Sequence, residues 1–195
     1  MEREVLLTGI GGQGVQLAAR TLAVAAIGDG REVMVFGSFG GSMRGGNTDA
    51  TVVLGDQALL TPPTVVRAWS ALAMHHAYWP ATRDRIDDDG VVVIDASVFR
   101  GDIGLDGPTV VAIEASTVAA DLGNPQGASM VALGALAAAT GLVTRGALVA
   151  AAAQVLPPYR AQHAQANATA LEAGFELVAG PRCEAWATVG SRGPR

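Results

Sequence analysis

The sequence predicts an α/β fold: a three-layer, Rossmann-like domain with a mostly parallel β-sheet and a helical C-terminal third. Short runs of β-branched residues alternate with longer alanine-rich segments, which is typical of strand–helix–strand units around a parallel sheet. After residue 113 the strand-like runs stop and only helical segments follow. The length of 195 residues favours one domain. We expect this domain to span residues 1–190, with residues 191–195 as a flexible tail.

Six strands are expected from short apolar runs that turn residues separate. The run Val91-Val92-Val93-Ile94 is continuously apolar, which suits a strand that is covered on both faces. Gly28-Asp29-Gly30 supplies a turn before the second strand, and Asp87-Asp88-Asp89-Gly90 supplies one before the fifth. In chain order, the strands are expected over residues 5–8, 32–36, 51–54, 70–74, 91–95 and 109–113.

The helices are expected from alanine-rich segments with recognisable ends. Asn124 followed by Pro125 is typical of an N-cap and a first-turn proline. Gly141 and Gly174 are expected to end helices, because glycine is favoured just after the last helical turn. In chain order, the helices are expected over residues 15–27, 78–86, 130–139, 147–155 and 160–173.

The composition excludes several kinds of chemistry. The chain has one cysteine and no lysine. It therefore cannot supply the four thiolates of an iron–sulfur cluster, a Walker A loop or a Schiff-base lysine. The net charge of −5 argues against nucleic acid as the main partner.

The histidines do not indicate a metal site. His75 and His76 are expected on a strand, where adjacent side chains point to opposite faces and do not readily bind one metal ion. His163 is expected at the surface or in an interface, because its helix carries no second ligand at a suitable spacing. We therefore expect neither a metal site nor a catalytic residue on this chain.

The sequence also lacks the signals of export or membrane insertion. Acidic residues near the N-terminus replace the positive charge of a signal peptide. The uncharged stretch over 128–144 is weakly apolar and contains Gly134 and Gly141, which favours a buried helix over a membrane span. We expect a cytoplasmic protein with no membrane partner.

A glycine-rich turn follows the first expected strand. Gly9-Ile10-Gly11-Gly12-Gln13-Gly14 has the G-x-G-x-x-G spacing, which lets a phosphate approach the backbone amides at the start of a helix. The alternative is that these glycines only let helix and sheet pack closely. A nicotinamide site would add an acidic residue at the end of the second strand, and Val35-Phe36-Gly37-Ser38 has none.

A second glycine-rich loop follows the second expected strand. Residues 37–48 hold five glycines and one cation, Arg44, whose guanidinium could contact phosphate or carboxylate. In a doubly wound sheet both loops leave the same edge, so they could flank one ligand or one partner surface. The alternative is a flexible loop with a solvated arginine. The candidate binding residues are Gly9, Gly11, Gly12, Gln13, Gly14, Ser38, Arg44, Gly45, Gly46 and Asn47.

The two loops together resemble the gamma subunits or gamma domains of 2-oxoacid:acceptor oxidoreductases, the family of pyruvate, 2-oxoglutarate, ketoisovalerate and indolepyruvate ferredoxin oxidoreductases. The N-terminal likeness rests on Gly9-Ile10-Gly11-Gly12-Gln13-Gly14-Val15 with Ala18-Ala19, Ser38-Phe39-Gly40 and Met43-Arg44-Gly45-Gly46. The C-terminal likeness rests on Leu122-Gly123-Asn124-Pro125, residues 130–136 and residues 167–174. The resemblance covers residues 4–178.

The resemblance implies a function that the residues alone do not show. Such enzymes decarboxylate a 2-oxoacid on thiamine diphosphate, pass electrons through iron–sulfur clusters and in most members release an acyl-CoA. The gamma part packs against the catalytic subunits and is associated with coenzyme A binding. This implies a non-catalytic gamma subunit, with thiamine diphosphate, magnesium and iron–sulfur clusters on partner subunits only. The glycine turn would meet a CoA phosphate or the partner, and Arg44 would contact CoA or a carboxylate.

The chain departs from the family pattern at two places. Family members usually have Tyr-Gly-Pro-Glu where this chain has Phe39-Gly40-Gly41-Ser42, and Asn where it has Ser129. Two alternatives therefore stay open. One is a freestanding nucleotide-dependent reductase that uses the turn at 9–14, and the other is a purely structural subunit of a related complex.

Overall fold

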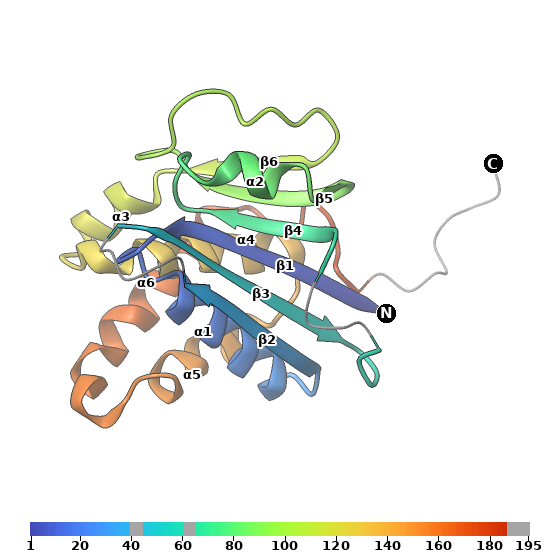
Figure 1. Cartoon of the computed structure of the whole chain (residues 1–195). Coiled ribbons are helices and arrows are strands. Elements are labelled where there is room, and N and C mark those ends of the chain that lie inside the picture. Colours follow the sequence, from blue (N-terminus) through green and yellow to red (C-terminus); the bar gives the residue numbers. More distant parts are fainter. Residues whose placement is uncertain (40–44, 61–64, 187–195) are drawn as a thin grey trace.

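The fold is built on a mixed β-sheet, which Figure 1 shows with most of the helices on one side. The computed structural model describes residues 1–39, 45–60 and 65–186. Within them the sheet has six strands in the order β2-β3-β1-β4-β5-β6. The strands are β1 (Glu2–Ile10), β2 (Glu32–Phe39), β3 (Asn47–Gly55), β4 (Ala68–Ala73), β5 (Ile86–Asp95) and β6 (Thr109–Ile113). All six expected strands are confirmed, although most are longer than predicted.

One strand, β3, runs against the others. It pairs antiparallel with both β1 and β2, whereas the β1–β4, β4–β5 and β5–β6 pairs are parallel. Residues 40–46 alone separate β2 from β3, and these are too few for the crossover that a parallel pair would need. As a result, β1 and β2 point the same way and their carboxyl ends lie at the same edge of the sheet. The mostly parallel sheet is confirmed, with β3 as its reversed strand.

Most of the helices cover one face of the sheet in two tiers. The α-helices are α1 (Val15–Gly28), α2 (Trp79–Arg83), α3 (Ala115–Asp121), α4 (Ala128–Thr140), α5 (Arg145–Gln154) and α6 (Ala164–Glu176). Two 3₁₀ turns, η1 (Pro125–Gly127) and η2 (Pro158–His163), precede α4 and α6. Helices α1 and α4 contact the strands, and α5 and α6 pack behind them. Among the described helices, none combines the length and apolarity needed to cross a lipid bilayer.

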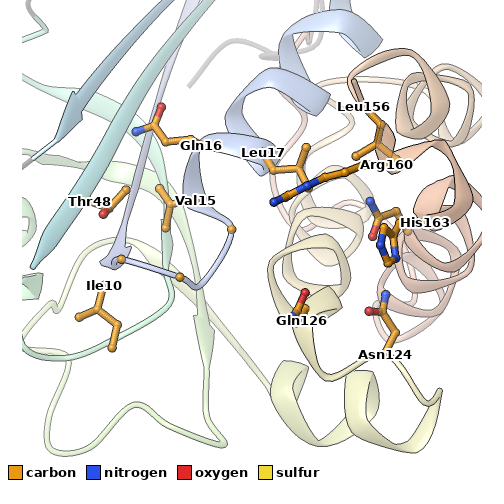
Figure 2. Close-up of a pocket in the computed structure, with 14 residues that line it drawn as sticks. Ile10, Val15, Gln16, Leu17, Thr48, Asn124, Gln126, Leu156, Arg160 and His163 are labelled. Carbon is orange, nitrogen blue, oxygen red and sulfur yellow. The ribbon is translucent and has the colours of Figure 1, made fainter. Parts of the chain in front are cut away.

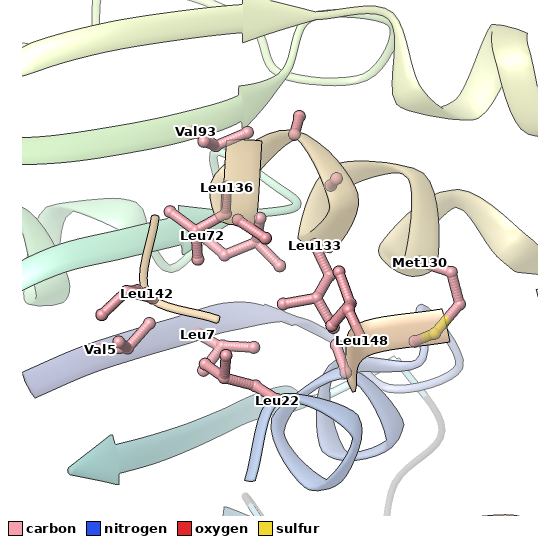
Figure 3. Packing of buried hydrophobic residues seen from close by; sticks show 14 of the residues in the cluster. Val5, Leu7, Leu22, Leu72, Val93, Met130, Leu133, Leu136, Leu142 and Leu148 are labelled. Carbon is pink, nitrogen blue, oxygen red and sulfur yellow. The ribbon is translucent and has the colours of Figure 1, made fainter. Parts of the chain in front are cut away.

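The main core lies between the sheet and helices α1 and α4. Leu7 and Leu72 from the strands meet Leu22 from α1 and Leu133 and Leu136 from α4 (Figure 3). Every residue of α4 is buried, because the sheet covers one side of this helix and other helices cover the rest. The uncharged stretch over 128–144 therefore contains a buried helix, as predicted.

A thinner layer covers the opposite face of the sheet. Trp79 of α2 packs edge-on against Phe99, with ring centroids 6.3 Å apart, and its indole N–H donates to the carbonyl oxygen of Ile103 at 2.7 Å. These residues join Leu6 and Val92 in a second hydrophobic cluster. The third layer of the fold is thus one short helix and the segment that follows β5.

One expected helix boundary is wrong. Gly174 lies inside α6 instead of ending it, because α6 crosses α4 there and a Cβ on Gly174 would overlap the carbonyl oxygen of Val131. Asn124 is the N-cap residue of η1 and Pro125 is the first residue of that turn, as predicted, although the Asn124 side chain makes no capping hydrogen bond. Gly141 also ends α4 with φ of 64°, as predicted.

The segment between β4 and β5 also differs from the prediction. The helix expected over 78–86 is shorter, because β5 already begins at Ile86. The expected turn at Asp87–Gly90 is part of that strand, opposite a register shift between Ala68 and Ser70. A Cβ on Gly90 would overlap the carbonyl oxygen of Trp69, so glycine permits this close approach of the two strands.

Candidate functional site

The turn between β1 and α1 has the conformation that the glycine motif predicts. Gly12 and Gly14 have φ angles of 103° and 82°, which residues with a Cβ rarely adopt. Gly14 is the N-cap of α1, no side chain caps the helix, and its first turn carries no acidic residue. The first hydrogen bond of the helix runs from the Ala18 amide to the Gly14 carbonyl oxygen at 2.9 Å. The amides of Val15, Gln16 and Leu17 in the first turn of the helix are therefore available to an anion.

Gln13 holds this turn in place. Its Oε1 accepts from the Ile10 amide at 2.9 Å, and its Nε2 donates to the carbonyl oxygen of Met74 at 3.1 Å. A Cβ on Gly9 would come within 2.7 Å of the same Oε1. Gly9 and Gln13 therefore shape the turn and connect it to the end of β4.

The two glycine-rich loops meet, as their position at one sheet edge predicts. The Gly11 amide donates to the Gly46 carbonyl oxygen at 2.9 Å, and Gly45 has φ of 81°. Asn47 begins β3 and donates through Nδ2 to Oδ2 of Asp49 at 2.6 Å. The backbone of Ser38 pairs with Asp49 in the sheet. Arg44 and the tail over 191–195 lie outside the described residues.

A cavity of about 560 Å³ opens beside the glycine turn (Figure 2). One wall consists of the turn, the start of α1 and Thr48, and the other comes from the C-terminal third. We call this space the glycine-loop cavity. Its lining residues are Ile10, Gly11, Gly12, Gly14, Val15, Gln16, Leu17, Thr48, Asn124, Gln126, Leu156, Arg160, His163 and Asn167.

The polar residues of the far wall were not among the predicted site residues. Arg160 and His163 lie on η2, and Asn167 lies at the start of α6. Their spacing of three and then four residues puts them on one face of a helical segment. This spacing is visible in the sequence, but the neighbouring residues do not indicate which part of the chain that helical face contacts. His163 is exposed, as predicted, and it also lines the cavity.

The glycine-loop cavity favours negative charge. None of its lining residues is acidic, and Arg160 forms no ion pair with any carboxylate of the described residues. The side chain of Asn167 is only 7% exposed and has no hydrogen-bond partner within the described chain. Nδ2 of Asn124 is also buried without a partner. The amide of Asn167, an arginine and an uncapped helix start therefore line one space, which suits a phosphate-bearing ligand.

The prediction that His75 and His76 point to opposite faces is wrong. Strand β4 ends at Ala73, so both histidines lie in the following turn and their rings stack with centroids 4.3 Å apart. Nδ1 of His75 accepts from the Ala77 amide, and Nδ1 of His76 accepts from the Arg100 amide. Burial lowers the pKa of His75, and the neighbouring His76 lowers it further. No group of three or more metal-binding side chains occurs in the part of the chain that the structure describes.

Comparison with known proteins gives a consistent set of similarities. The model of the pyruvate ferredoxin/flavodoxin oxidoreductase family matches residues 4–177. The 2-oxoglutarate synthase subunit KorC of Archaeoglobus fulgidus is 30% identical over 179 residues, which cover 91% of this chain and 89% of that protein.

Two solved structures have a similar fold. The gamma subunit of a keto/oxoacid ferredoxin oxidoreductase from Geobacter sulfurreducens has a TM-score of 0.74 and 28% identity, over 90% of this chain and 95% of that one. The 2-oxoglutarate:ferredoxin oxidoreductase of Magnetococcus marinus, solved with 2-oxoglutarate, coenzyme A and succinyl-CoA, has a TM-score of 0.79 and 21% identity. This second match covers 90% of the present chain but 31% of the larger one, and it shows the shared fold.

Proposed function

The chain belongs to the pyruvate ferredoxin/flavodoxin oxidoreductase family as a gamma subunit of a multi-subunit 2-oxoacid oxidoreductase, and we propose that it binds coenzyme A in the glycine-loop cavity. The observation that carries this proposal is the uncapped start of α1, which faces a cavity without acidic residues. Backbone amides at such a helix start favour a diphosphate, and coenzyme A contains one.

The residues of the cavity fit this ligand. Gly12 lines the cavity, and a Cβ placed on it would have no neighbour within 4 Å, so a phosphate can approach the backbone there without meeting a side chain. The cavity volume of about 560 Å³ lies within the range of small-molecule sites, roughly 300–1,000 Å³. Coenzyme A, when bound, supplies the thiol that accepts an acyl group. The residues of this chain bind and orient it, and they take no part in the bond-making steps.

The redox cofactors are assigned to partner subunits in this proposal. The chain has one cysteine, too few for an iron–sulfur cluster. Thiamine diphosphate, its magnesium ion and the clusters would reside on the subunits with which this gamma subunit assembles. Those partners, acting together with it, would convert a 2-oxoacid to an acyl-CoA.

A titration tests ligand binding and discriminates between the alternatives. We expect calorimetry of the purified chain, or of its complex with thiamine-binding and iron–sulfur partner subunits, to detect coenzyme A. Binding of NADH or FAD without coenzyme A would instead favour a freestanding reductase. Stable assembly without binding of any of these ligands would favour a purely structural subunit. If the chain stayed monomeric and did not bind those subunits, the proposal of assembly would be contradicted.

Two matched glycine substitutions locate the site. Gly12 and Gly30 both have positive φ and no neighbour near their Cβ position, but only Gly12 lines the cavity. Each change to alanine should cost about 1–2 kcal/mol of stability from backbone strain. Only Gly12→Ala should weaken coenzyme A binding, by tenfold or more. Equal affinities in the two variants would remove the glycine turn from the site.

A further inference from the structure

We propose that Arg160, His163 and Asn167 form a second anion subsite, which recognises a phosphomonoester on the same ligand whose diphosphate lies at the glycine turn. This inference rests on the proposed function and names the chemical group of the ligand that the far wall of the cavity would bind. The ligand class is a nucleotide that carries a diphosphate and a separate terminal phosphate. Coenzyme A has both groups, and so does NADP(H).

The first support is the position of the three side chains. Figure 2 shows Arg160 and His163 across the cavity from Ile10 and Thr48, with the guanidinium of Arg160 extended toward Leu17. The glycine turn lies with Ile10 and Thr48, so the amide donors and the arginine belong to different walls. A single phosphate at the turn would therefore leave the donors of the far wall without a partner.

The second support is the burial of Asn167 in the far wall. Asn167 is more than nine-tenths buried, lines the cavity and has no hydrogen-bond partner among the described residues. The polar atoms of Asn167 are not sealed from solvent, so a ligand in the cavity can reach its amide. The wall is also held firmly, because Ala170 and Leu171 of the same helix are fully buried against the core.

The third support is the chemistry of Arg160. Its guanidinium lies 5.7 Å from the ring centroid of Tyr159, and it forms no ion pair in the described structure. A guanidinium presents paired donors that match two phosphate oxygens at once. His163, one turn further along, adds a ring nitrogen to the same wall. Together they suit a terminal phosphate, which carries more negative charge than each phosphate within a diphosphate.

The experiment compares ligands that differ only in the terminal phosphate. Calorimetry on the full chain would measure coenzyme A and 3′-dephospho-coenzyme A against the native protein, Arg160→Ala and the control Arg83→Ala. Arg83 pairs with Asp84 on the far side of the sheet. We expect the native protein and Arg83→Ala to bind coenzyme A at least tenfold more tightly than the dephospho form. Arg160→Ala should lose this preference and keep its affinity for the dephospho form.

The outcomes separate this inference from the proposed function. Equal binding of both ligands by the native protein, or a preference that survives in Arg160→Ala, would overturn the phosphomonoester subsite and leave coenzyme A binding intact. If NADP⁺ bound in place of coenzyme A and its binding required Arg160, the phosphomonoester subsite would be supported and the proposal that the ligand is coenzyme A would be contradicted. Failure to bind any of these ligands would overturn both.

Discussion

Gly174 of α6 lies against the carbonyl oxygen of Val131 in α4, at a distance that leaves no room for a Cβ. One turn away on the other helix, a Cβ on Gly134 would overlap the carbonyl oxygen of Leu171. Each helix thus presents a glycine to the backbone of the other. This reciprocal arrangement brings α6 close to α4 and sets the position of the cavity wall that α6 carries.

Alanine at position 174 should destabilise the protein, although alanine favours helices. In a helix interior the change from glycine to alanine normally gains up to about 1 kcal/mol. At Gly174 the new methyl would meet the Val131 backbone, and such overpacking costs about 1–3 kcal/mol or more. Gly146 of α5 is a matched control, because its Cβ position has no neighbour within 4 Å. Urea denaturation should show opposite signs for Gly174→Ala and Gly146→Ala, and equal effects would contradict this packing.

A second prediction concerns Gly14 and Ser129. A Cβ on Gly14 would overlap the Oγ of Ser129, and Gly14 has positive φ, so Gly14→Ala should cost about 2–4 kcal/mol from strain and overlap together. The Oγ of Ser129 is buried without a partner, so Ser129→Ala alone should gain about 1 kcal/mol. A double-mutant cycle measured by chemical denaturation should show that Ser129→Ala relieves part of the Gly14→Ala loss. Strict additivity would show that the two sites do not touch.

Ionisation of Glu4 should lower the stability of the folded protein as the pH rises above the ordinary pKa of a glutamate. Burial raises the pKa of Glu4 above 4.5, and the nearby carboxylates of Asp87 and Glu2 raise it further. The folded protein therefore binds this proton more tightly than the unfolded chain does, so ionisation costs stability between the unfolded and folded pKa values. Glu4→Gln should be more stable than the native protein at pH 7 and equal to it near pH 4. Denaturation curves at both pH values provide the check, and a gain that is the same at each would exclude this cause.

His75 should have the opposite dependence on pH. Its folded pKa lies below the usual value of 6.5, so the unfolded chain takes up the proton first. The stability that neutral His75 contributes is fully present above pH 6.5 and is lost as the pH falls through the folded pKa. His75→Asn keeps an acceptor for the Ala77 amide but cannot titrate. The melting temperature should therefore fall less steeply between pH 7.5 and pH 5.5 in this variant than in the native protein. An equal fall in both proteins would assign the effect to another group.

Much of the fold could be predicted because its signals are local. The strands follow from β-branched runs, and the turn at 9–14 follows from a glycine spacing that lies between an expected strand and an expected helix. The resemblance to the gamma subunits rests on these same loops, and it is confirmed. The buried helix at α4 was visible as an uncharged stretch too weakly apolar for a membrane.

The errors arise where the answer depends on distant parts of the chain. Gly174 has the sequence signature of a helix end, and only the contact with Val131 shows why glycine is needed inside the helix. His75 and His76 were assigned to strand geometry, but β4 stops at Ala73. Arg160 and Asn167 share a helical face, yet the sequence does not show that this face meets a turn some 150 residues earlier.

The two walls of the glycine-loop cavity come from opposite ends of the polypeptide, residues 10–17 and residues 124–167. On the ribosome the glycine turn emerges first, and at roughly 5–20 residues per second the far wall is complete only about 7–30 s later. A nascent chain therefore has no complete site for most of its synthesis. The cavity belongs to the finished product alone, and a prematurely terminated chain would lack the wall that carries Arg160.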